Sequence, residues 1–109
     1  MSLYFPTDEE CSRRTIFPGV SIAACAAEKM TLSLATLAPG AVAAQHSHPH
    51  EQVGIVIEGR AAFFIGGEEK TLGPGDRFCI PGGVTHKVVA LDKPVKILDV
   101  FYPIREEYV

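Results

Sequence analysis

The 109-residue sequence lacks long apolar runs, and no stretch reaches the roughly 18 consecutive apolar residues that a membrane helix requires. It also lacks any cluster of lysine and arginine, and its formal net charge is −3, so the basic surface that nucleic-acid binding demands is missing. The first residues, MSLYFPTDEECSRR, carry acids where a signal peptide would have a basic region and an apolar core. We therefore expect a cytoplasmic protein that binds neither membranes nor nucleic acid.

Cysteine is scarce, and the three residues Cys11, Cys25 and Cys79 form an odd and widely spaced set. This pattern fits reduced thiols better than a disulfide framework or a zinc knuckle, and we expect the three side chains to be small buried apolar groups. With 47% hydrophobic and 21% charged residues, the composition is that of a folded globular chain. A length of 109 residues predicts one domain.

Long helical periodicity is also absent, whereas short runs rich in β-branched and aromatic residues recur between glycines and prolines. The glycine pair at 66 and 67 is the strongest hairpin signal, because both residues tolerate positive φ. The pattern predicts an all-β sandwich or barrel. The predicted strands are Val20–Ala26, Met30–Leu37, Gln52–Glu58, Ala61–Ile65, Lys70–Leu72, Arg77–Ile80, His86–Ala90 and Val95–Phe101.

Three of the four histidines lie in the stretch HSHPHEQ, residues 46 to 52, and His86 follows in PGGVTH. Because side chains alternate along a strand, we expect His46 and His48 to point the same way from one strand. Their nitrogens could then bind one metal ion at about 2 Å, with Gln52 and His86 supplying further ligands. The alternatives are that the histidines cluster in a loop by chance, or that the stretch is polar and binds no metal. Pro49 should turn His50 away from the site.

The predicted strand Gln52–Glu58 is apolar on both faces. Gly54 and Val56 follow Gln52 on one side, while Val53, Ile55 and Ile57 occupy the other. One face should line an interior, and the second should pack against another layer or another subunit. We therefore predict a homodimer. The aromatic residues expected in the core or an interface are Tyr4, Phe5, Phe17, Phe63 and Phe64, and Tyr102 is expected to border the pocket.

Two spaced motifs resemble those of the cupins, a family of small β-barrels. The first motif is matched by Gly40, His46, His48 and Gly59, with Gln52 where a glutamate is usual. The second is matched by Gly75, Pro81, Gly83 and His86, with Ala90 where an asparagine is common.

The resemblance implies a single-domain cupin β-barrel, a double-stranded β-helix or jelly roll, over 18–102, between an N-terminal extension (1–17) and a C-terminal tail (103–109). It also implies that one divalent transition metal per chain is bound by His46, His48, Gln52 and His86. A neutral amide at Gln52 leaves the full charge of such an ion in place, which favours Lewis-acid work and anionic substrates. Nickel, zinc, manganese, iron and copper all remain open as the metal.

The segment VKILDVFYPIREEYV places Asp99 on the same strand face as Val95, Ile97 and Phe101. A carboxylate among apolar neighbours is either a structural group with hydrogen-bond partners or a general acid–base group. Arg105 is either solvated or a clamp for a substrate carboxylate.

This tail, together with the histidine motifs, resembles the pectin-degradation cupins, which convert cyclic 4,5-unsaturated uronates released by pectate or alginate lyases into linear ketonised sugars. The resemblance implies that Asp99, Phe101 and Arg105 are catalytic residues. Non-enzymatic binding of a small acid, a dioxygenase and an isomerase of another sugar are the alternatives.

Overall fold

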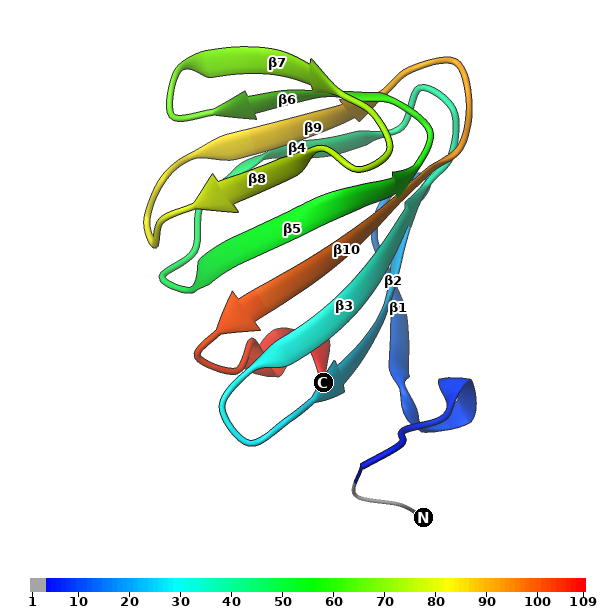
Figure 1. Cartoon of the computed structure of the whole chain (residues 1–109), viewed down its shortest axis with the longest axis vertical. Helices are drawn as coiled ribbons and strands as arrows, with labels where there is room; N and C mark the ends of the chain where they lie inside the picture. The colour runs from blue at the N-terminus through cyan, green and yellow to red at the C-terminus, as the bar shows by residue number, and fades with distance from the viewer. Residues whose placement is uncertain (1–3) are drawn as a thin grey trace.

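The computed structural model describes residues 4–109 and consists of ten strands in two antiparallel sheets that face each other (Figure 1). The six-stranded sheet contains, in order across it, β1 (Ser12–Phe17), β2 (Val20–Ala26), β3 (Thr31–Leu37), β10 (Val95–Tyr102), β5 (Glu51–Glu58) and β8 (Arg77–Ile80). The four-stranded sheet contains β4 (Val42–His46), β9 (His86–Ala90), β6 (Ala61–Ile65) and β7 (Glu68–Leu72). Two short 3₁₀ turns, η1 (Asp8–Glu10) and η2 (Glu106–Tyr108), flank the strands. The predicted all-β fold is confirmed.

From β3 onward the chain passes repeatedly between the two sheets, which is the connectivity of a jelly roll. Apolar side chains from both sheets fill the space between them, and Leu37, Val56 and Ile80 are almost completely buried. Across this interior the rings of Phe63 and Phe78 lie 4.8 Å apart. Burial of each such side chain contributes about 1.5–3 kcal/mol, so this core holds the two sheets together.

Several strands match the sequence predictions, and the glycine hairpin is confirmed. Gly66 and Gly67 have φ values of 56° and 87° and join Ile65 to its partner Glu68. The strands β1 and β4 were missing from the predicted set because Arg, Ser and Ala have low strand propensity and leave weak signals. The placement of His46 and His48 on one strand is wrong, since β4 ends at His46 and His48 lies in the following loop.

The predicted two-sided character of β5 is confirmed. Gln52 and Val56 are buried in the interior, whereas Val53 and Ile57 are exposed on the outer face of the six-stranded sheet. Tyr4 and Phe5 are exposed as well, so they are not part of the core, and their alternative placement in an interface stays a prediction. Between Tyr4 and Val109, no helix combines the length and the apolar character needed to cross a bilayer.

After β10 the chain turns back, and η2 packs against the open side of the barrel (Figure 1). The backbone amide of Arg105 donates a hydrogen bond to the buried hydroxyl of Thr31 on β3, at 2.9 Å. The ring of Tyr108 meets that of Phe101 edge to face, with centroids 5.5 Å apart. These contacts place the C-terminal segment next to the cavity inside the barrel.

Candidate metal centre

The structure brings His46, His48 and His86 together, with one ring nitrogen from each lying within 4.8 Å of the others. His46 ends β4 and His86 begins β9, and the two residues are directly paired across the four-stranded sheet. Their ring centroids are 4.3 Å apart, and that of His48 lies 5.0 Å from His86. The cluster is therefore formed where two strand ends and one loop meet. The three histidines do not share a strand.

Each of the three imidazoles is oriented by a backbone carbonyl next to its Nδ1 atom. The carbonyl oxygen belongs to Ala44 for His46 at 2.7 Å, to Val84 for His86 at 2.9 Å, and to His50 for His48 at 3.1 Å. A carbonyl oxygen only accepts hydrogen bonds, so Nδ1 carries the proton in the neutral ring and Nε2 keeps a lone pair. This is the tautomer in which Nε2 can bind a metal. His50 takes part only through its backbone.

The local environment keeps two of these rings neutral. Burial, together with the positive charge of Arg105, lowers the pKa of His48 to about 4. Burial also lowers the pKa of His86. Both imidazoles are therefore unprotonated at Nε2 near neutral pH, as a ligand must be.

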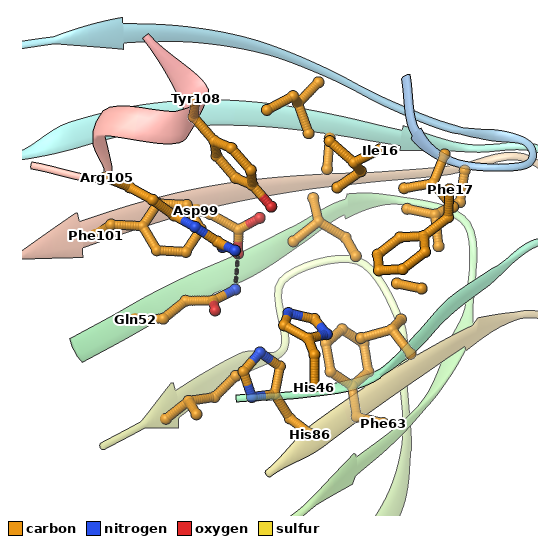
Figure 2. Close-up of a pocket in the computed structure, with 18 of the residues that line it drawn as sticks. Ile16, Phe17, His46, Gln52, Phe63, His86, Asp99, Phe101, Arg105 and Tyr108 are labelled. Atoms are coloured by element: carbon orange, nitrogen blue, oxygen red, sulfur yellow. Dashed lines mark hydrogen bonds between the residues drawn. The ribbon is translucent and has the colours of Figure 1, made fainter. Parts of the chain in front are cut away.

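Gln52 at the start of β5 connects the histidines to Asp99. Its amide nitrogen donates to Asp99 Oδ1 at 3.0 Å (Figure 2). This bond turns the amide oxygen toward His48 Nε2, also at 3.0 Å. With the Nδ1 proton of His48 directed at a carbonyl, two lone pairs face each other across this distance. Two acceptors this close repel unless a cation lies near both. The residues present thus fit a metal ion.

Asp99 is buried on the inner face of β10. Burial raises its pKa to about 7, while the hydrogen bond from Gln52 and the charge of Arg105 act in the opposite direction. Space for the carboxyl group comes from Gly54, its cross-strand neighbour on β5. A Cβ atom at Gly54 would lie 2.8 Å from Asp99 Oδ1. Asp99 lies on the same buried face of β10 as Val95, Ile97 and Phe101, as strand alternation predicts.

Arg105 is buried between two aromatic rings. Its guanidinium carbon lies 4.9 Å from the centroid of Phe101 and 3.9 Å from that of Tyr108. Its Nε atom is 3.4 Å from a carboxylate oxygen of Glu107 but makes no hydrogen bond. The guanidinium group is therefore held by stacking on these two rings.

A cavity inside the barrel joins these groups (Figure 2). Its polar lining residues are His46, Gln52, His86, Asp99, Arg105 and Tyr108, and His48 reaches it through Gln52. Leu37, Phe63 and Phe78 belong to its apolar wall. Phe101 also lines it.

Tyr108 was missed by the sequence predictions, and Tyr102 was named in its place. Tyr102 ends β10 on the outer side, is 52% exposed and does not line the cavity. Strand alternation could not locate Tyr108, because the chain has left the sheet before this residue. The only signal was an aromatic residue three positions after Arg105.

The jelly roll and the three convergent imidazoles define a small metal-binding β-barrel protein. The sequence model of the cupin domain matches residues 33–101, and the chain belongs to the cupin family.

Relatives are similar over most of the chain. An uncharacterized protein of Streptomyces coelicolor is 29% identical over 99 residues, which cover 91% of this chain and 94% of that protein. The pectin degradation protein KdgF of Dickeya dadantii is 32% identical over 72 residues, 65% of this chain and 66% of that protein. The solved structure of KdgF from a Halomonas species superposes with a TM-score of 0.86 at 29% identity, covering 96% of this chain and 97% of that one.

Proposed function

We propose that the protein is a metal-dependent enzyme that converts cyclic 4,5-unsaturated uronates into their linear ketonised form. The observation that carries this proposal is the placement of Asp99 and Arg105 in the same cavity as the histidine cluster. It is supported by the similarity to two proteins named KdgF, one of them a pectin degradation protein. The reaction is an isomerisation, so it requires no oxidant, nucleotide or organic cofactor.

His46, His48, Gln52 and His86 would hold one divalent transition ion per chain, with nickel, zinc, manganese and iron as the candidates. When bound, the ion supplies a Lewis acid that lowers the pKa of a substrate hydroxyl. The orientation of Gln52 supports its role as the fourth ligand, because the hydrogen bond to Asp99 directs the amide oxygen at the histidines.

Asp99 would move the proton in this reaction. The anomeric hydroxyl must lose a proton as the ring opens, and the enol carbon must gain one to give the ketone. Asp99 Oδ1 accepts the hydrogen bond from Gln52, which leaves Oδ2 for the substrate. The same carboxyl group can take the first proton and deliver the second. Arg105 would pair with the carboxylate of the uronate, and Phe101 would form a wall beside the sugar ring.

A second candidate function follows from the apolar wall of the cavity. Leu37, Phe63 and Phe78 offer no hydrogen bonds to the several hydroxyl groups of a sugar. This wall favours a less polar acid, bound without turnover or oxidised by a dioxygenase at the same metal centre.

We further propose that the exposed apolar face of the six-stranded sheet docks against a second copy of the chain. Single-domain monomers rarely leave a large apolar patch in water, and here Leu34, Val53 and Ile57 are all exposed. The exposed Arg77 of β8 pairs with Ile55 of β5, and the exposed Glu58 ends β5, so charges of both signs lie beside this face. Such a patch suits a two-fold symmetric contact in which acid meets base.

The proposed reaction is tested with unsaturated galacturonate freshly released by a lyase. The metal-loaded protein should speed the decay of its ultraviolet absorbance, and chelator-treated protein should not. An oxygen electrode run in parallel should record no consumption. Decay no faster than the blank would overturn the ketonase proposal, and oxygen uptake would assign the site to a dioxygenase.

A further inference from the structure

Tyr108 is a largely buried residue whose phenol lines the metal-site cavity. The residue is only 7% exposed, and its hydroxyl is directed toward Asp99 and Arg105 in Figure 2. Among the fully buried polar atoms of residues 4–109 that lack a hydrogen-bond partner, Arg105 Nε is present and the Tyr108 hydroxyl is not. The hydroxyl is thus accessible to a molecule that enters the cavity beside an arginine with an unused donor.

Arg105 has unused donors beside this phenol. Its guanidinium group stacks 3.9 Å from the Tyr108 ring, and its only ion pair in the described chain is the 3.4 Å contact of Nε with Glu107. The side chain of Glu107 is 56% exposed, so water weakens this pairing. A stacked cation and a phenol thus present hydrogen-bond donors to the same space.

An acceptor with two oxygen atoms fits this pair of donors. A carboxylate only accepts hydrogen bonds and can take one from each side chain, whereas a sugar hydroxyl would leave the positive charge unpaired. Burial raises the pKa of Tyr108, so the phenol keeps its proton and remains a donor at neutral pH.

We propose that Tyr108 and Arg105 form a carboxylate-binding subsite in which the Tyr108 hydroxyl donates a hydrogen bond to the acid group that Arg105 neutralises. This inference rests on the proposed function for the identity of the acid, a uronate. The subsite makes the protein select acidic sugars over neutral ones. Tyr108 is thereby a specificity-determining residue contributed by the C-terminal segment.

The kinetic test replaces Tyr108 with Phe, which removes one oxygen and keeps the ring contacts with Phe101 and Arg105. A hydrogen bond to a charged group contributes enough that KM should rise by about 10–100-fold. The contact is present before and during the reaction, so kcat should change little. Metal content and the thermal unfolding curve should match the wild type. Tyr102→Phe makes the same chemical change outside the cavity and should leave KM unaltered.

A binding test separates this subsite from the proposed reaction. Calorimetry on the metal-loaded protein compares galacturonate with galactose, which differ in the acid group. The wild type should prefer the acid, and Tyr108→Phe should lose about 10–100-fold in affinity for the acid while binding of galactose stays the same. This result would support the subsite even if no unsaturated uronate were converted.

Three outcomes would overturn the subsite. They are unchanged affinity and KM in Tyr108→Phe, equal loss for the acid and the neutral sugar, and a wild type that binds no acid. If the wild type converts unsaturated uronates but Tyr108→Phe keeps its KM, the proposed reaction stands and the subsite falls.

Discussion

Part of the six-stranded sheet reverses the usual distribution, with polar side chains on its inner face and apolar side chains on its outer face. On β3 the inner residues Thr31 and Ser33 are fully buried, while the outer residues Leu32 and Leu34 are 45% and 40% exposed. Buried polar groups are costly without partners, and exposed apolar groups gain nothing from solvent. This reversed distribution of polar and apolar residues indicates that a requirement other than the stability of the barrel determines the residues on each face.

On the inner face, several polar groups bind to one another or to the tail. Thr31 accepts a hydrogen bond from the backbone amide of Arg105, and Gln52 donates one to Asp99, whereas the buried hydroxyl of Ser33 has no hydrogen-bond partner among residues 4–109. The outer face has no such network, and its apolar residues form a surface without cover in the described chain. The inner polar residues thus belong to the candidate site, whereas the outer apolar residues form the surface that we propose for docking. Changes on the two faces should therefore have different consequences.

The largest effect is expected from His48→Ala on the inner side. Removing one of three convergent imidazoles should reduce the bound metal from about one ion per chain to nearly none and abolish turnover. The apolar core is untouched, so the fold should persist. Elemental analysis and circular dichroism measure the two properties. His50→Ala is the matched control, because His50 contributes only its backbone carbonyl; a His48→Ala protein that binds metal normally would show the ligand set to be wrong.

Asp99→Asn should have the next largest effect. The asparagine oxygen can still accept the hydrogen bond from Gln52, so the metal should remain bound. Loss of the proton-transferring carboxyl group should lower kcat by roughly 10²–10⁴-fold. Steady-state kinetics on the metal-loaded variant provide the measurement. Full activity would return Asp99 to a purely structural role.

Gly54→Ala tests whether a substitution on the inner face of β5 costs more stability than one on its outer face. The added Cβ would clash with the ring of Phe78 on β8, and it would lie 2.8 Å from both Asp99 Oδ1 and the carbonyl oxygen of Leu98. Relief requires movement of Phe78 and of β10, so the free energy of unfolding should fall by about 1–3 kcal/mol. Val53→Ala, one position away on the outer face, should change it by less than about 1 kcal/mol. Urea titrations at a single protein concentration compare the two, and equal losses would remove the distinction between the faces.

The smallest effect on catalysis is expected from Leu34→Lys on the outer face. A charge in the docking surface should separate the dimer into chains of 11.7 kDa while kcat remains unchanged. Light scattering at micromolar concentration reports the mass. Thr71→Lys, an exposed position on β7 of the other sheet, adds the same charge and should leave the dimer intact. A wild type that already scatters as a single chain would contradict the proposed dimer.

Much of the barrel and of the histidine cluster could be predicted because those signals are local. Alternation along β5 correctly separated Gln52 and Val56 from Val53 and Ile57. The contacts that orient the site could not be predicted in this way. The Gln52–Asp99 hydrogen bond joins strands 47 residues apart, and His48 reaches the cluster from a loop whose course depends on tertiary packing.

The large distance in sequence between residues that touch also affects how the protein folds. The link from Arg105 to Thr31 spans 74 residues, and chains dominated by such distant contacts fold slowly. His46 and His86, on neighbouring strands, come together only when the chain has closed on itself. Full coordination of a metal ion by the three histidines therefore requires the closed barrel. Binding of the ion would add a mass-action stabilisation that grows with the logarithm of free metal concentration, so metal supply in the cell would set the fraction of molecules that is folded.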